Sequence, residues 1–282
     1  MLLMNLIHTV ANLYLPRELV GYIAARGVLR RYRQGVMIER DMMVLPYLLD
    51  PGDWAIDIGA AIGDYTIWLA HLVGNSGRVF AFEPLPWNVN KLKSLVQVAD
   101  LADGVEIHQA AVGEESGTTS MFVPWGSGEY RVRSGHIVSG TQSASRGRQI
   151  RVPMDTLDRL FPDCPQFRFV KIDTEGMELP VLRGGLLLLR RWHPHLLVEI
   201  SPCHHRYGYD RADLVRFLEE LGYQPLLLSK DGMGWSLHVT DIPELARIHT
   251  CNCYFADCSE VQRLLDTVNS NLRNGQRAGP QY

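Results

Sequence analysis

Apolar residues in this chain follow two alternating patterns from residue 54 onward. Short continuous apolar runs, typical of buried strands, are followed by stretches in which apolar residues recur every three or four positions, as in helices. The pattern first predicts a strand at 54–58, a helix at 64–73, a strand at 78–82, a helix at 86–99 and a strand at 105–109. Strands that alternate with helices form a parallel sheet covered on both faces, so we predict an α/β fold.

The alternation stops between residues 113 and 150, where Gly, Ser and Thr are frequent. This stretch predicts a β-hairpin insertion with a mobile loop that selects the substrate, and a solvated linker is the alternative. The pattern resumes with strands at 167–173, 195–200, 223–229 and 251–256, and with helices at 178–191 and 210–222. We therefore expect one domain over residues 51–260.

The two ends of the chain lie outside this alternation. Residues 1–50 predict a helical extension, and residues 261–282 predict a helix followed by a flexible tail. The first fifteen residues are apolar, but they lack the pattern of a signal peptide and are too few to span a bilayer. We expect them to pack on the domain's own sheet; a membrane surface or a homodimer partner is the alternative. Without an export signal, the expected location is cytoplasmic, or peripheral to a membrane in that alternative.

Composition narrows the class of partner. The 282 residues include 46% hydrophobic and 21% charged residues, with a formal charge of −3 and a pI near 6.4. This balance provides no basic surface of the kind that binds nucleic acid. Five irregularly spaced cysteines predict neither a disulfide framework nor a zinc site, so we expect reduced thiols.

A glycine turn and an acidic strand end predict a nucleoside site. Gly59 and Gly63 lie between the first predicted strand and its helix, where glycine lets the backbone approach a ligand and the helix offers unpaired N–H groups. Glu83 ends the next strand, a position from which a carboxylate accepts hydrogen bonds from ribose hydroxyls.

The charge of the ligand follows from Asp57, which lies at the end of the first strand. A dinucleotide site requires G-x-G-x-x-G, whereas Ala60 and Ala61 lie between the two glycines here. A carboxylate at Asp57 would repel a pyrophosphate but would suit the cationic amino acid part of S-adenosylmethionine. The residues therefore favour S-adenosylmethionine over NAD.

Further carboxylates end the later strands. Asp173 and Glu199 join the earlier two at the carboxyl edge of the predicted sheet, where ligands bind in such folds. Four carboxylates there predict a site for a cation, with one or more left for base chemistry. For Glu175 and Glu178, a role at the helix start and a role in the site are equally open. His204 and His205 follow Glu199 closely, so that one is a candidate base and a surface position is the alternative.

Five blocks of sequence together resemble one family. They are DIGAAIGDYT, VFAFEP, VPMDTLD, VKIDTEGMELPVLRGG and LLVEI, in this order. This order is similar to that of the FkbM-family methyltransferases over about residues 38–258. The resemblance implies a class I Rossmann-like sheet that is mostly parallel with an antiparallel last strand, and methyl transfer from S-adenosylmethionine, usually to a hydroxyl oxygen. The acceptors implied are sugars, polyketide-like metabolites or glycans.

The resemblance also implies roles for single residues. The glycine-loop residues would hold the methionine part, Glu83 the ribose, Ala111 the adenine, and Asp173 would lie near the transferred methyl group. Ala61 departs from the family, in which many members have Asn there. The cofactor-binding residues implied are Asp57, Gly59, Ala61, Gly63, Thr66, Glu83, Pro84, Ala111 and Asp173.

Methyl transfer to an alcohol needs alignment of the two reactants and removal of the hydroxyl proton. The candidate bases are Asp173, Glu199, His204 and His205. A divalent metal shared by Asp173 and Glu199 is conceivable, but no ligand motif supports it and no metal ligand is predicted. Two alternatives stay open: an N-methyltransferase, which needs no strong base, and a catalytically silent cofactor-binding partner protein.

Overall fold

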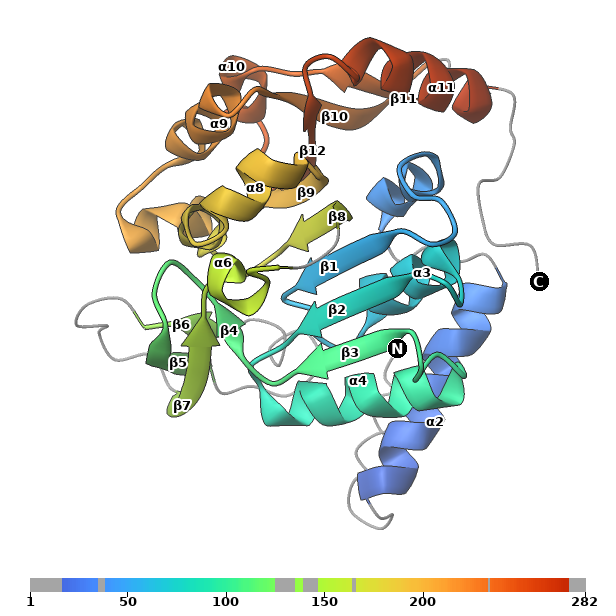
Figure 1. The fold of residues 1–282 in the computed structure, drawn as a ribbon, viewed down its shortest axis with the longest axis vertical. Helices are drawn as coiled ribbons and strands as arrows, with labels where there is room; N and C mark the ends of the chain where they lie inside the picture. The colour runs from blue at the N-terminus through green and yellow to red at the C-terminus, as the bar shows by residue number, and fades with distance from the viewer. Residues whose placement is uncertain are drawn as a thin grey trace.

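The computed structural model describes residues 17–34, 39–124, 135–138, 147–163, 166–232 and 234–273. These residues form an eight-stranded sheet in the order β11-β10-β12-β9-β8-β1-β2-β3 (Figure 1). Its strands are β1 (Trp54–Ile58), β2 (Arg78–Phe82), β3 (Val105–His108), β8 (Phe167–Ile172), β9 (His195–Ile200), β10 (Tyr223–Asp231), β11 (Gly234–Val239) and β12 (Cys251–Asp257). The predicted α/β fold is confirmed.

Strand direction also agrees with the resemblance. Strand β1 is parallel to β2 and β8, and the outer neighbours β3 and β9 continue this parallel core. The last strand, β12, is antiparallel to both β9 and β10. The structure adds one edge strand that the pattern does not predict, β11, which pairs antiparallel with β10.

Helices cover both faces of the sheet. Successive strand residues point to opposite faces, so each strand contributes side chains to two hydrophobic cores. Ala55 belongs to one hydrophobic core and Ile56 to the other. The first core lies under α2 (Arg17–Arg33), α3 (Asp64–Val73), α4 (Pro86–Val98) and α11 (Val261–Arg273). The second core lies under α7 (Glu178–Arg183), α8 (Leu186–Trp192) and α9 (Arg211–Glu220). Two further helices are short: α6 (Leu157–Leu160) and α10 (Ile242–Leu245).

The single helix predicted over 178–191 is wrong. The structure has two helices, α7 and α8, with Gly184 and Gly185 between them. A side chain at Gly184 would collide with the backbone carbonyl of Gly113, and one at Gly185 would press against Leu157. The glycine pair therefore allows a distant loop to approach closely, which helical spacing of apolar residues cannot reveal.

Four strands between residues 111 and 155 build a second, smaller sheet in the order β4-β7-β5-β6. Its strands are β4 (Ala111–Val112), β5 (Gly117–Pro124), β6 (His136–Ile137) and β7 (Gly147–Asp155). Strands β5 and β7 form an antiparallel pair, and Met121 and Val123 pack on Leu85, which follows β2. The small sheet thus lies next to the carboxyl ends of the main strands (Figure 1). Within the predicted insertion at 113–150, residues 125–134 and 139–146 lie outside the described residues.

The terminal helices belong to the same body. Helix α2 buries Val28, Leu29 and Tyr32 in the first core and packs against α4. Helix α11 covers the edge strand β11, where the Asn269 amide donates to and accepts from the backbone of Leu237 at 2.8 Å each. The apolar first fifteen residues and the predicted tail lie outside the described ranges. Within those ranges, no helix is both long and apolar enough to cross a bilayer.

The turn after β1 depends on a missing side chain. Gly59 has a φ of 81°, and a Cβ there would collide with the backbone carbonyl of Asp173. We expect Gly59→Ala to lower the free energy of unfolding by about 2–4 kcal/mol, since it adds both strain and a clash. Urea unfolding of the full chain measures this change.

Gly27 provides the matched control. It is an exposed residue inside α2 with no atom within 4 Å of a Cβ at that position. Gly27→Ala should stabilise the protein by about 0.5–1 kcal/mol, because alanine is the better helix former. Equal stability of the two alanine variants would contradict the steric explanation for Gly59.

Candidate functional site

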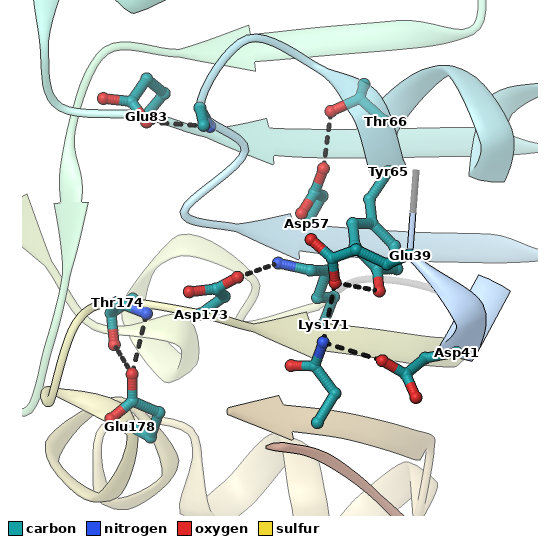
Figure 2. Close-up of polar contacts among 12 residues, drawn as sticks. Glu39, Asp41, Asp57, Tyr65, Thr66, Glu83, Lys171, Asp173, Thr174 and Glu178 are labelled. Carbon is teal, nitrogen blue, oxygen red and sulfur yellow. Dashed lines mark hydrogen bonds and ion pairs between the residues drawn. The ribbon is translucent and has the colours of Figure 1, made fainter. Parts of the chain in front are cut away.

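Four of the predicted site carboxylates lie at one edge of the main sheet. Glu83 follows β2, Asp57 lies near the end of β1, Asp173 follows β8, and Glu199 lies near the end of β9. Strands β2, β1, β8 and β9 are neighbours and run parallel, so their carboxyl ends meet at the same edge. Figure 2 shows Glu83, Asp57 and Asp173 along this edge.

Asp57 is fully buried and only half satisfied. Its Oδ2 accepts a hydrogen bond of 2.6 Å from Thr66 Oγ1, whereas its Oδ1 is buried and has no hydrogen-bond partner. Burial raises the pKa of Asp57, and the nearby ammonium of Lys171 opposes this shift. The first turn of α3 therefore holds the carboxylate through Thr66 and leaves one oxygen for another donor.

Glu83 holds the turn that follows β1. Its Oε2 accepts from the backbone N–H of Ala61 at 2.9 Å, and its Oε1 accepts from Leu85 N at 2.8 Å and Asn88 Nδ2 at 3.3 Å. Burial raises the pKa of Glu83 to about 7 against these hydrogen bonds. A carboxylate accepts about four hydrogen bonds, so one acceptor position remains for a ligand hydroxyl. Pro84, half-buried, joins this carboxylate to the start of the next segment.

Gly59 and Gly63 were expected to let the backbone approach a ligand, but in the structure they let it approach other parts of the chain. The space beside Gly59 is filled by the backbone of Asp173, and a side chain at Gly63 would collide with Leu92. Both residues have positive φ angles, and Ala61 between them has a φ of 50°. The glycines thus let chain segments approach one another, and the resulting turn presents its backbone at the sheet edge.

Lys171 is a residue that the sequence reasoning missed. Its side chain on β8 is 3% exposed, and its Nζ forms an ion pair of 2.9 Å with Asp173 Oδ2. The ammonium also lies 4.5 Å from the centre of the Tyr65 ring. Burial lowers the pKa of Lys171, but Asp173, Asp57 and Glu39 outweigh it and hold the pKa above its ordinary value. A lone lysine inside the apolar run FRFVKID was the signal for it.

A second network fixes the segment that precedes β1. Glu39 Oε2 accepts from Tyr65 OH at 2.9 Å and from Asn252 Nδ2 at 2.8 Å, and Asn252 Nδ2 also lies 3.1 Å from Asp41 Oδ2 (Figure 2). Tyr254 OH donates to the backbone carbonyl of Asp41. Burial raises the pKa of Asp41 to about 6. Residues near 40 are thereby tied to β12 beside the carboxylate edge.

Glu178 is a structural residue of the loop after β8. It is fully buried, and its Oε1 accepts from Thr174 N, Thr174 Oγ1 and Gly176 N at 2.8–3.2 Å. The pKa of Glu178 lies below its ordinary value. Burial alone would raise this pKa, but the contact with His204 and the hydrogen bonds to the backbone outweigh the effect of burial. Glu175 differs: its φ is 57°, and burial together with Asp173 and Glu178 raises its pKa to about 7.

The two candidate histidines differ in burial: His204 is buried and His205 is exposed. His204 is 1% exposed, its Nε2 lies 3.1 Å from Glu178 Oε2, and its ring stacks on Tyr209 with centroids 4.9 Å apart. His205 is exposed on the turn Pro202–Tyr207 and acts electrostatically on Asp210. His204 is thus held between Glu178 and Tyr209, whereas His205 faces solvent.

Glu199 is the carboxylate best suited to hold a proton. Its Oε2 is buried without a hydrogen-bond partner. Burial, followed by the charges of Asp173, Glu178 and Glu175, raises its pKa to about 9. In the small sheet, Ala111 on β4 is buried and pairs with Met154 on β7.

The edge carboxylates leave buried acceptor oxygens without partners. Asp57 Oδ1 and Glu199 Oε2 are buried oxygens without partners, and Lys171 is the lysine that the structure places among the edge carboxylates. Among the residues described, no group of three or more His, Cys, Asp and Glu side chains is arranged to hold a metal. A ligand with distributed positive charge and several hydroxyl groups would satisfy the free acceptors.

Comparison with known proteins gives the chain a family. A family model described as the methyltransferase FkbM domain matches residues 57–225. Methyltransferase 1 of Beauveria bassiana is 24% identical over 164 residues, which are 53% of this chain and 64% of that protein. The chain therefore spans less than two thirds of this relative's length.

Two solved structures are similar to this chain at low sequence identity. Methyltransferase FkbM from Methylobacillus flagellatus is 19% identical, with a TM-score of 0.46, over 73% of this chain and 43% of that one. A SAM-dependent methyltransferase from Aquifex aeolicus is 14% identical, with a TM-score of 0.41, over 82% and 98%. Because the family model covers more than half of the chain, from Asp57 through β8 and β9, this protein belongs to the family of the methyltransferase FkbM domain.

Proposed function

We propose that this protein is a methyltransferase that uses S-adenosylmethionine to methylate a hydroxyl oxygen of a small molecule or glycan. The observation that carries the proposal is the row of edge carboxylates, Glu83, Asp57, Asp173 and Glu199, with Lys171 as the cation among them. Their summed charge favours a cationic guest, and two of their oxygens are buried without a partner.

Each part of the cofactor has a candidate partner. Thr66 binds Asp57 Oδ2 and leaves Oδ1 free. This free oxygen would accept a hydrogen bond from the ammonium of the methionine part. Glu83, with one acceptor position left, would take one ribose hydroxyl. The turn at Gly59–Gly63 and the buried Ala111 would line the rest of the nucleoside. The bound cofactor supplies a methyl group on a positively charged sulfur.

The acceptor hydroxyl needs a proton acceptor, for which Glu199 is our candidate. A general base works best when its pKa lies near the working pH, and the pKa of Glu199, raised to about 9, makes it a stronger base than an ordinary carboxylate. A neighbouring cation would lower this pKa and ionise the group. Asp173 forms an ion pair with Lys171, so we assign it to orienting the hydroxyl by accepting its hydrogen bond.

The first prediction concerns cofactor affinity. We expect calorimetry to detect binding of S-adenosylmethionine but not of NAD, and Glu83→Gln to weaken this binding about tenfold or more through loss of a charge-assisted hydrogen bond. Glu106→Gln is the control, because Glu106 is an exposed carboxylate on the adjacent strand β3. Equal weakening by both variants, or stronger binding of NAD, would contradict the assignment.

The second prediction concerns pH. Glu83 and Glu199 have pKa values raised to about 7 and about 9, so both take up protons in the ligand-free protein at neutral pH. A cation binds the ionised forms, so affinity for S-adenosylmethionine should rise between pH 6 and 9, about tenfold per pH unit for each proton released. Calorimetry in buffers of different ionisation enthalpy counts these protons. S-adenosylhomocysteine, which lacks the sulfonium charge, should show a shallower rise; two equal slopes would sink the electrostatic account.

The third prediction separates the two carboxylates in turnover. Glu199→Gln should lower kcat about 10²–10⁴-fold even at saturating cofactor, because it removes the base. Asp173→Asn should raise the KM of the acceptor and lower kcat less, since an amide oxygen still accepts a hydrogen bond. Full turnover by Glu199→Gln would place the base elsewhere.

A paired acceptor panel tests the chemistry itself. Sugars and their amino-sugar analogues, supplied with S-adenosylmethionine, differ only in the nucleophile. Release of S-adenosylhomocysteine with the hydroxyl member supports O-methylation, whereas release with the amino member alone would support the N-methyltransferase alternative. Cofactor binding without turnover on any member of a broad panel would favour the silent partner protein.

A further inference from the structure

Lys171 occupies an unusual place for a lysine. It lies in the middle of the parallel core, with register partner Asp57 on β1 and Leu197 on β9, and its side chain is 3% exposed. Burying an ammonium is costly unless anions and hydrogen-bond acceptors surround it. Its Nζ donates to Asp173 Oδ2 at 2.9 Å and lies over the Tyr65 ring (Figure 2).

Anionic and titratable groups face this lysine, or its partner Asp57, from every neighbouring element. They are Asp57 from β1, Asp64 and Tyr65 from α3, Asp173 from the loop after β8, Glu199 from β9, and Glu39 and Asp41 from the segment before β1. Lys171 is therefore the positive centre of a cluster whose other members are acids.

The support behind the lysine comes from outside the family match. Glu39 precedes residue 57 and Asn252 follows residue 225, the ends of that match. Glu39 Oε2 accepts from both Tyr65 OH and Asn252 Nδ2, which fixes the ring on which the ammonium lies. The chain thus uses its own flanking segments to hold Lys171 in place.

Lys171 interacts with both Asp57 and Asp173. In the proposed function, Asp57 binds the ammonium of the cofactor and Asp173 orients the acceptor hydroxyl. Two carboxylates in a closed, poorly hydrated space share a proton unless a cation stands between them. Without Lys171, Asp57 would gain affinity for a proton, and a cationic ligand would have to displace this proton before binding.

We propose that Lys171 is a positioning residue of the cofactor site: its fixed positive charge keeps Asp57 available to a cationic ligand, and its ion pair with Asp173 orients that carboxylate toward the ligand. This inference rests on the proposed use of S-adenosylmethionine. Through it, the segments that flank the family domain become part of the site, because they hold the lysine from behind.

The test uses Lys171→Met and Lys171→Gln in the full chain. Methionine removes the charge and the hydrogen bond, whereas glutamine keeps a donor for Asp173 and removes only the charge. Calorimetry should show that both variants bind S-adenosylmethionine about tenfold or more weakly than the wild type at pH 7, and that most of the loss is recovered at pH 9. Thermal unfolding identifies which variant is folded, and either one alone supplies the comparison between the two pH values.

Lys93→Met is the matched control, because Lys93 is exposed on α4 and the substitution changes the net charge equally. It should bind like the wild type at both pH values. A loss by the Lys171 variants that is the same at pH 7 and pH 9 would indicate a packing role, and wild-type affinity of Lys171→Gln at pH 7 would show that the charge is unnecessary; either result overturns the inference. Failure of the wild type itself to bind S-adenosylmethionine would instead overturn the proposed function.

Discussion

The close approach of β1 to β8 is the constraint on which the site depends. Asp173 N donates to Ile58 O at 3.0 Å, and the backbone of Asp173 occupies the space beside Gly59 that a side chain would need. This contact places the turn after β1 and the loop after β8 against each other. As a result, the residues assigned to the cofactor and those assigned to methyl transfer share one edge, although Asp57 and Asp173 lie 116 positions apart in the sequence.

The elements around this contact could be predicted from local patterns. Periodicity placed β1, α3 and β2 within a residue of their observed bounds, because each is a regular element buried in one layer. The carboxylates were found because each ends a strand, and the carboxyl ends of parallel strands meet. The break between α7 and α8 was missed because its cause is a contact with Gly113, far away in the chain.

Pairings between distant residues account for the rest of what was missed. Glu178 and His204 both have polar side chains near strand ends, and nothing local shows that they bind each other at 3.1 Å. The role of Lys171 can be inferred only from its contacts with Tyr65, Glu39 and the edge carboxylates. Sequence reasoning finds a residue that stands at the end of an element, but it does not find a partner that tertiary packing supplies.

The small sheet is linked by hydrogen bonds to the loop that carries Asp173. Tyr207 OH donates to the backbone carbonyl of Ile137 on β6 at 2.8 Å, and Arg206 donates to the carbonyl of Glu175 at 3.1 Å. The turn Pro202–Tyr207 therefore links β6 to the loop that carries Asp173. Because these bonds use backbone carbonyls, the side chains of β6 and the loop can vary without breaking the link, which suits a surface that selects among acceptors.

The excess of negative charge has a cost that the fold bears before any ligand arrives. Buried carboxylates with raised pKa values, such as Glu83 and Glu199, bind protons more tightly in the folded chain than in the unfolded one. Their contribution to stability is therefore present at low pH and is lost as the pH rises through their folded-state pKa values. A cation bound at the edge would replace those protons and restore the balance. The carboxylates whose ionisation weakens the empty protein as the pH rises would then become the source of its affinity, a trade of stability for function expected of a binding site.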